Sequence, residues 1–213
     1  MHEVFVERLR DTGLVPVIVL EQALEARPLA EALLAGDLPI LEITLRSAAG
    51  LPAIESLAAD SRWTVGAGTV LNRDEARRAI DAGAQFVVAP GLDEATVAYC
   101  LDRQVPVIPG VCTASEVQRA FNMGLRLLKF FPAEAFGGAA TVKALGGPFP
   151  QVRFVPTGGI GVEGLAAYLK LSNVAAVGGS WMVTRELLAA RDYGTVTGLA
   201  ATARAQVQAS RRQ

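Results

Sequence analysis

Lys129 stands inside an apolar run, Leu127-Leu128-Lys129-Phe130-Phe131, in a chain where only three of the 20 basic residues are lysines. An arginine keeps its proton at neutral pH, whereas a lysine amine removed from water can lose its proton and attack a carbonyl carbon. These residues predict a Schiff-base enzyme with Lys129 as its nucleophile. The alternative is a surface lysine whose stem lies along the protein. We assign Lys143 and Lys170, in mixed sequences, to helix surfaces.

Glu42 is a carboxylate in a second apolar run, Leu41-Glu42-Ile43-Thr44. A buried carboxylate is costly unless it is protonated or paired with a cation. An ion pair with Arg46, or with an arginine of a helix, would be a structural explanation. A second buried ionisable residue, Lys129, favours catalysis instead, because a carboxylate beside a Schiff-base lysine can carry protons to and from the reaction intermediates.

Arg46 and Thr69 each follow an apolar run and are candidates for holding a substrate carboxylate. The guanidinium of arginine offers a planar set of donors that matches a carboxylate. Thr69 follows Gly66-Ala67-Gly68, where small residues let the backbone approach a ligand. Taken alone, Arg46 would be a solvated surface residue, so its assignment depends on Glu42 and Lys129.

Two glycine pairs, Thr157-Gly158-Gly159 and Gly178-Gly179-Ser180, follow the last two apolar runs. Backbone N–H groups in such turns bind anions, and barrel enzymes often hold phosphate in the loops after their seventh and eighth strands. The alternative is that the glycines serve as turn residues. The expected substrate is a small phosphorylated molecule with a keto group and a carboxylate.

Short apolar runs that could position these residues recur along the whole chain and alternate with alanine-rich helical segments. The eight runs are Leu14–Leu20, Leu38–Thr44, Trp63–Thr69, Gln85–Pro90, Val105–Pro109, Arg126–Phe131, Val152–Thr157 and Val174–Gly179. This order predicts the α/β class and a (β/α)8 TIM barrel, with one domain over residues 1–213. A doubly wound open sheet is the alternative fold, although no glycine-rich dinucleotide motif follows the first run.

The helical segments carry recognisable end signals. Asn72 and Asp93 are suited to begin the helices predicted over residues 73–82 and 94–103, and Thr113-Ala-Ser-Glu116 has the form of a capping box. Glycine in the left-handed conformation often ends a helix. We predict this role at three positions: Gly36, Gly83 and Gly124.

Composition narrows the possible functions. The chain has 213 residues, 51% of them hydrophobic, with a net charge of −1 and a pI near 5.9, so no electrostatic feature favours nucleic acid or membrane partners. The first residues lack a signal-peptide pattern, and a cytoplasmic location is expected. His2 is the only histidine, which excludes a histidine triad or a histidine-rich zinc site. Cys100 and Cys112 have no metal-binding spacing, so we predict neither a metal nor a cofactor.

Motifs along nearly the full chain resemble those of one enzyme family, the class I 2-keto-3-deoxy-6-phosphogluconate (KDPG) aldolases, which also act on 4-hydroxy-2-oxoglutarate. The matching segments are Val15-Pro-Val-Ile-Val19, Leu41-Glu-Ile-Thr-Leu-Arg46, Val65-Gly-Ala-Gly-Thr-Val-Leu71, Gly83-Ala-Gln-Phe86, Pro90-Gly-Leu92, Leu128-Lys-Phe-Phe-Pro-Ala-Glu134, Gly147-Pro-Phe149, Val152-Arg-Phe154, Pro156-Thr-Gly-Gly-Ile160 and Gly178-Gly-Ser-Trp181. Single glycine pairs would be weak evidence, but together and in this order the motifs are specific.

The resemblance implies roles for individual residues. Lys129 matches the Schiff-base lysine, Glu42 the general acid–base that works through a bound water, and Arg46 and Thr69 ligands of the pyruvyl carboxylate. It further implies that the pyruvyl pocket is formed by Pro90, Phe131 and Thr157. The phosphate would bind at Gly158, Gly159, Gly179 and Ser180. The implied reaction cleaves KDPG to pyruvate and glyceraldehyde 3-phosphate in the Entner–Doudoroff pathway. Members of the family are typically homotrimers.

Three positions depart from the family pattern: Ala89, Cys112 and Phe136. None of them removes a group that the chemistry needs, although Cys112 and Phe136 could affect substrate preference. Two alternatives within this chemistry are an aldolase for 4-hydroxy-2-oxoglutarate and one for the galactonate epimer of KDPG. An alternative of another class is a barrel that binds phosphosugars without catalysis; the joint presence of Lys129 and Glu42 argues against it.

Overall fold

The computed structural model describes residues 2–211, with side chains from Val4 onwards, so Met1, Arg212 and Gln213 of the predicted domain lie outside the described residues. The strands are β1 Leu14–Ile18, β2 Ile40–Thr44, β3 Thr64–Gly68, β4 Phe86–Val88, β5 Val107–Ile108, β6 Gly110–Val111, β7 Leu127–Phe130, β8 Arg153–Pro156 and β9 Val177–Gly179. The α-helices are α1 His2–Thr12, α2 Ala26–Ala35, α3 Gly50–Ala58, α4 Arg73–Asp81, α5 Glu94–Asp102, α6 Ala114–Asn122, α7 Gly138–Gly146, α8 Leu165–Leu169, α9 Arg185–Ala189 and α10 Tyr193–Arg211. Two short 3-10 helices, η1 Ala23–Glu25 and η2 Glu134–Phe136, complete the described elements.

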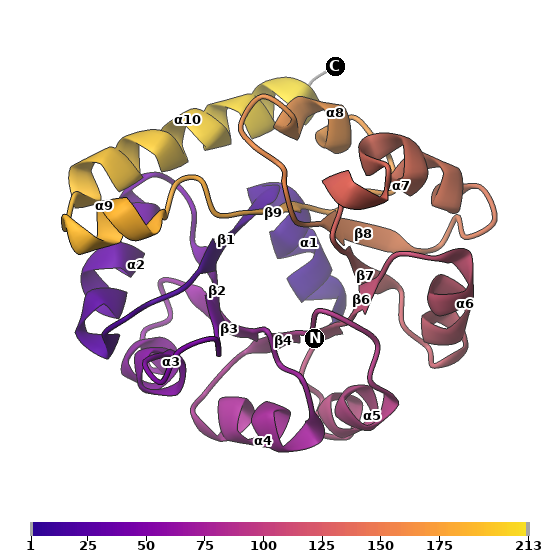
Figure 1. Cartoon of the computed structure of the whole chain (residues 1–213), viewed down its shortest axis with the longest axis horizontal. Coiled ribbons are helices and arrows are strands. Elements are labelled where there is room, and N and C mark those ends of the chain that lie inside the picture. The colour runs from indigo at the N-terminus through magenta and orange to yellow at the C-terminus, as the bar shows by residue number, and fades with distance from the viewer. Residues whose placement is uncertain (1, 212–213) are drawn as a thin grey trace.

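The strands form a curled parallel sheet with helices around its outside (Figure 1). One ladder has the order β5-β4-β3-β2-β1-β9 and a second has the order β6-β7-β8. Pro109 separates β5 from β6, and two isolated parallel bridges, Phe154 to Val174 and Thr157 to Gly178, connect β8 to the β9 segment. The protein therefore has an α/β fold with an open, curled parallel sheet.

Every one of the eight predicted runs contains a strand, and the run predicted to end at Pro109 continues beyond it as β6. Proline lacks a backbone N–H, so it interrupts the ladder at this point. Strands that follow one another in the chain are neighbours within each ladder. A doubly wound sheet would reverse its strand order, so the alternative fold prediction was wrong for the described residues.

The predicted helix starts are confirmed. The side chain of Asn72 accepts a hydrogen bond from Glu75 N at 2.9 Å, and that of Asp93 accepts one from Thr96 N at 2.8 Å. The Thr113–Glu116 capping box is also present.

Two of the three predicted glycine caps are confirmed. Gly83 and Gly124 have φ angles of +93° and +90°. The prediction for Gly36 was wrong, because its φ is −87° and Asp37 takes the left-handed position instead. A Cβ atom at Gly36 would lie 2.5 Å from that of Ala200, so this glycine allows α10 to pack closely on α2.

Helix α1, which the sequence analysis did not predict, closes one end of the curled sheet. Phe5 and Leu9 are buried in an apolar cluster with strand residues that include Val15, Ile40, Phe86, Ile108, Leu127 and Val155. The rings of Phe5 and Phe86 have centroids 5.0 Å apart. Figure 1 shows α1 near the centre of the view, within the ring of strands. Ligands must therefore enter from the opposite end, where the strands terminate.

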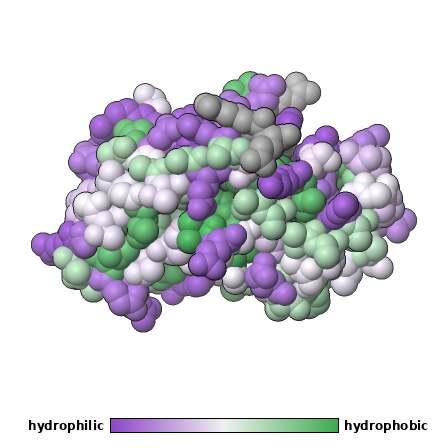
Figure 2. Space-filling view, turned by 90° about the horizontal axis from the view of Figure 1, so that it is seen from above, coloured by the Kyte–Doolittle hydropathy of each residue, from purple (hydrophilic) through white to green (hydrophobic). Residues whose placement is uncertain are grey.

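The outer surface is mixed in character. Hydrophilic and hydrophobic residues are interspersed on the face seen in Figure 2. Lys143 in α7 and Lys170 after α8 are exposed, as predicted, whereas Cys100 is buried in α5. Within residues 2–211, no helix combines the length and the apolar character needed to cross a membrane.

We expect Phe5→Ala to lower the free energy of unfolding by about 3 kcal/mol, because the removed ring fills one end of the interior of the curled sheet. Urea-induced unfolding followed by circular dichroism measures this change. The matched control is Val4→Ala at a neighbouring position that is 68% exposed, where the change should stay below about 0.5 kcal/mol. Equal effects of the two substitutions would contradict the role given to α1.

Candidate active site

A buried ion pair joins Lys129 and Glu42 across the inside of the curled sheet. Lys129 Nζ lies 3.5 Å from Glu42 Oε1, and the two side chains are 7% and 4% exposed. Side chains two residues apart on a strand share a face. Lys129 and Glu42 each lie two residues beyond an interior residue, Leu127 and Ile40 respectively. The pair therefore lies closer to the carboxyl ends of the strands than Leu127 and Ile40 do.

Two glycines allow close packing at and beside this pair. A Cβ atom at Gly68 on β3 would lie 2.3 Å from Glu42 Oε1. Gly110 on β6 pairs with Lys129, and a Cβ atom there would lie 2.0 Å from the carbonyl oxygen of Pro90. Glu42 Oε1 has no hydrogen-bond donor among the described residues. The charged group that this buried oxygen faces is Lys129 Nζ, at 3.5 Å.

Arg46 and Thr69 come together at the carboxyl ends of β2 and β3. Arg46 Nε donates a hydrogen bond to Thr69 Oγ1 at 3.3 Å. Thr69 has a φ of 57°, a left-handed conformation that is uncommon for a residue other than glycine and often occurs at functional sites. Within the described part of the chain Arg46 forms no salt bridge, and Glu42 pairs with Lys129. The structural explanation of Glu42 as a partner of Arg46 was therefore wrong.

A cavity of about 660 Å³ opens at the same end of the sheet. Seven of the predicted site residues line it: Arg46, Phe131, Thr157, Gly158, Gly159, Gly179 and Ser180. Phe131 connects this cavity to the buried pair, because its ring centroid lies 5.1 Å from Lys129 Nζ. The four other predicted residues, Lys129, Glu42, Thr69 and Pro90, are not among the lining residues.

The two predicted glycine pairs shape one wall of this cavity. Gly158 and Gly159 have φ angles of +104° and +79°, which a residue with a side chain rarely adopts. A Cβ atom at Gly178 would lie 2.3 Å from Thr157 Oγ1. The backbone of both turns thus reaches the cavity without intervening side chains.

Among the lining residues that were not predicted, five have polar side-chain atoms: Glu21, Ser47, Trp181, Thr184 and Arg185. The signal that could have found Arg185 is its position, a basic residue at a helix start shortly after Gly178-Gly179-Ser180, with Thr184 as the helix cap. Glu21 follows β1 in the same way that Arg46 follows β2. Arg185 and Glu21 form an ion pair of 2.9 Å across the cavity rim.

Neither cysteine competes with Lys129 as a nucleophile. Cys112 directly follows β6, and burial together with its hydrogen bond to Glu116 raises the pKa of its thiol. Burial raises the pKa of the Cys100 thiol to about 11. Because the thiolate is the reactive form, both are poor nucleophiles at neutral pH.

The other two departures from the family pattern leave the buried pair intact. Ala89 is buried at the end of β4, and Phe136 is 47% exposed in η2. Among the described residues, no cluster of three or more histidine, cysteine, aspartate or glutamate side chains could hold a metal ion.

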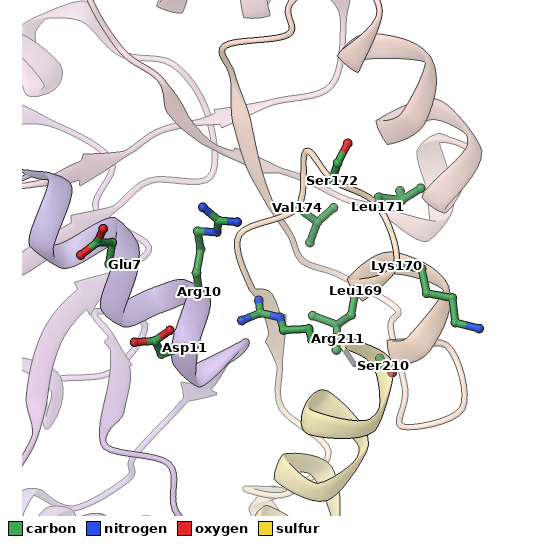
Figure 3. A pocket seen from close by; sticks show the side chains of 10 residues that line it. All are labelled: Glu7, Arg10, Asp11, Leu169, Lys170, Leu171, Ser172, Val174, Ser210 and Arg211. Carbon is green, nitrogen blue, oxygen red and sulfur yellow. The ribbon is translucent and has the colours of Figure 1, made fainter. Parts of the chain in front are cut away.

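A second cavity, of about 760 Å³, lies at the opposite end of the strands, between α1, the segment after α8 and the end of α10 (Figure 3). Acidic Glu7 and Asp11 line it together with basic Arg10, Lys170 and Arg211. It contains none of the predicted site residues. Its mixed charge and its position away from the carboxyl ends of the strands give it no part in the chemistry of Lys129.

A buried lysine lies beside a carboxylate near the carboxyl ends of parallel strands, which is where enzymes of this architecture place their active sites. This arrangement is suited to a Schiff-base lyase. The chain belongs to the KDPG and KHG aldolase family, whose model matches residues 5–199.

Two relatives illustrate the similarity in sequence. The 2-dehydro-3-deoxy-phosphogluconate aldolase of Treponema pallidum is 45% identical, over 91% of this chain and 92% of its own. The KHG/KDPG aldolase of Escherichia coli K12 is 44% identical, over the same shares of the two chains.

Solved structures agree with the fold. The KDPG aldolase of Legionella pneumophila, with pyruvate captured as a covalent carbinolamine intermediate, has a TM-score of 0.89 and 39% identity, covering 92% of this chain and 95% of its own. The 2-keto-3-deoxy-6-phosphogluconate aldolase of Zymomonas mobilis ZM4, with 3-phosphoglycerate, has a TM-score of 0.88 and 40% identity, covering 95% and 94%.

We expect Gly68→Ala to lower aldolase turnover by about 100-fold, because the added methyl group would displace the carboxylate of Glu42 from Lys129. Steady-state rates measure the loss, and circular dichroism checks that the fold is kept. Gly198→Ala in α10 is the matched control, since nothing lies within 4 Å of its added Cβ atom. Wild-type turnover in Gly68→Ala would contradict the importance of this pair.

Proposed function

We propose that this chain is a class I aldolase that cleaves KDPG to pyruvate and glyceraldehyde 3-phosphate through an imine on Lys129. The observation that carries the proposal is the buried pair of Lys129 Nζ and Glu42 Oε1, 3.5 Å apart at the carboxyl ends of the strands. The carbinolamine named for the Legionella pneumophila aldolase supports a covalent route of the same kind.

The first step forms the imine. Glu42 is positioned to take a proton from the Lys129 ammonium, and the free amine then attacks the C2 ketone of the substrate. Loss of water from the carbinolamine leaves a protonated imine.

The second step breaks the C3–C4 bond. The C4 hydroxyl loses its proton with the help of Glu42, C4 becomes the aldehyde carbon of glyceraldehyde 3-phosphate, and the bonding electrons move to C3 and form an enamine. The enamine is then protonated at C3, and hydrolysis of the imine releases pyruvate and returns Lys129 to its amine. The protonated imine serves as the electron sink, so the mechanism needs neither a metal nor a cofactor.

The substrate is proposed to lie along the cavity. Arg46 and Thr69 bind its carboxylate, while Pro90, Phe131 and Thr157 enclose the pyruvyl group. Phe131 supports this placement because its ring lies beside Lys129 Nζ and also lines the cavity. The phosphate binds at the turns that contain Gly158, Gly159, Gly179 and Ser180, where backbone N–H groups suit an anion.

The finer predictions about architecture belong to the same proposal. We propose that the sheet closes as a complete (β/α)8 barrel, an idea supported by the two parallel bridges that link β8 to the β9 segment. We also propose one domain over residues 1–213, supported by Arg204 near the C-terminus, which donates hydrogen bonds to the carbonyl oxygens of Asp11 and Thr12. The homotrimer and the cytoplasmic location remain predictions.

Activity on 4-hydroxy-2-oxoglutarate is the second candidate function, since the Escherichia coli relative is named a KHG/KDPG aldolase. The galactonate epimer of KDPG would use the same Lys129 chemistry. Rates on the three substrates separate these possibilities: a strong preference for a phosphorylated substrate disfavours 4-hydroxy-2-oxoglutarate, and a faster rate on KDPG than on its epimer favours KDPG. A barrel that binds phosphosugars without catalysis would form no covalent adduct with pyruvate.

We expect Lys129→Arg to lose turnover by more than about 1,000-fold, because a guanidinium cannot form the imine. Borohydride reduction in the presence of pyruvate, followed by peptide mass mapping, should find an adduct on Lys129 in the wild type and none in the variant. Lys143→Arg, on the exposed surface of α7, should keep both turnover and adduct. An adduct elsewhere, or none in the wild type, would overturn the proposal.

We expect Glu42→Gln to lose turnover by about 100-fold while still forming the pyruvate adduct slowly, because the amide cannot carry protons but leaves the amine in place. Single-turnover trapping separates slow imine formation from slow cleavage. Glu55→Gln on the exposed side of α3 controls for loss of one carboxylate. Wild-type turnover in Glu42→Gln would make Glu42 a purely structural residue.

A further inference from the structure

Three charged residues line the cavity of about 660 Å³: Glu21, Arg46 and Arg185. Arg46 lies beside Thr69, on the side proposed for the substrate carboxylate. Arg185 lies on the wall formed by the glycine turns, since it begins α9 a few residues after Ser180. The only acidic lining residue, Glu21, is held by Arg185, with Oε1 at 2.9 Å from a guanidinium nitrogen.

The Glu21–Arg185 pair forms a boundary between two cavities. Val19, Glu21 and Arg185 line both the large cavity and a smaller neighbouring one of about 260 Å³. The pair connects the segment after β1 with the start of α9, which are far apart in the sequence. The pair therefore places a cation, Arg185, at the glycine-lined end of the cavity. It also places there an anion, Glu21, that would compete with a bound phosphate for Arg185.

The Glu21–Arg185 ion pair is weak enough for another anion to replace Glu21. The side chains of Arg185 and Glu21 are 76% and 59% exposed, and an exposed ion pair contributes little to stability. A phosphate carries more charge than a carboxylate and accepts paired hydrogen bonds from the planar guanidinium. A phosphorylated ligand can thus replace Glu21 at small cost.

We infer that Arg185 binds the phosphate group of the substrate, and that Glu21 occupies its guanidinium until the phosphate displaces it. The inference rests on the proposed function and adds two residues that set the preference for a phosphorylated over an unphosphorylated substrate. Arg185 binds the charge, and Glu21 limits how tightly anions are held in the empty site.

The turnover test uses KDPG and its unphosphorylated counterpart, 2-keto-3-deoxygluconate. Arg185→Gln should raise KM for KDPG about tenfold with kcat kept, and should leave KM for the unphosphorylated substrate unchanged. Glu21→Gln should lower KM for KDPG by about two- to fivefold. Because Glu21 acts through Arg185, the double variant should match Arg185→Gln. Arg77→Gln, which breaks the exposed Arg77–Asp81 pair of α4, is the matched control.

Binding of inorganic phosphate, followed by calorimetry, tests the same site without turnover. Arg185→Gln should weaken phosphate binding about tenfold, and Glu21→Gln should strengthen it. Equal affinities in the wild type and both variants would overturn the inference. Borohydride trapping of pyruvate on each variant reports on Lys129 alone, so trapping without the phosphate effect refutes only this inference. Absence of trapping in the wild type refutes the proposed function instead.

Discussion

The organisation of the site depends on one interaction, the buried ion pair between Lys129 and Glu42. Leaving either charge unpaired in the interior would cost about 3–5 kcal/mol, so neither residue can be placed without the other. The pair also determines its neighbours, because Gly68 must lack a side chain if the Glu42 carboxylate is to reach Lys129. Glycine weakens a strand, and its presence on β3 is explained by the space that this pair needs.

The same strands serve two purposes at their two ends. At the end closed by α1, interior strand residues bury Phe5 and Leu9 in an apolar cluster that contributes stability. Beyond that layer the interior side chains become ionisable, and beyond the strand ends the loops supply Arg46, Thr69 and the glycine turns. The apolar packing around α1 therefore stabilises the fold on one side of Lys129 and Glu42. This stability offsets the cost of burying two ionisable groups at the catalytic end.

Features carried by local sequence could be predicted. Each of the eight apolar runs contains a strand, the Thr113–Glu116 capping box begins a helix where expected, and Lys129 and Glu42 were recognisable as ionisable residues within apolar runs. Features that depend on contacts through space could not. Gly36 is explained by close packing against Ala200, in a helix far along the chain. The Glu21–Arg185 pair joins residues that are far apart in the sequence.

The chain divides its basic residues by chemistry as well as by position. All three lysines lie in the described part of the chain, and Lys129 is the one that is buried, while Lys143 and Lys170 are exposed. The two cations that line the cavity, Arg46 and Arg185, are both arginines, whose charge persists at any working pH. Permanent charge suits the binding of a carboxylate or a phosphate, whereas attack on a ketone needs an amine that can be neutral. Exchanging these residue types would therefore damage both binding and chemistry, although the net charge would stay the same.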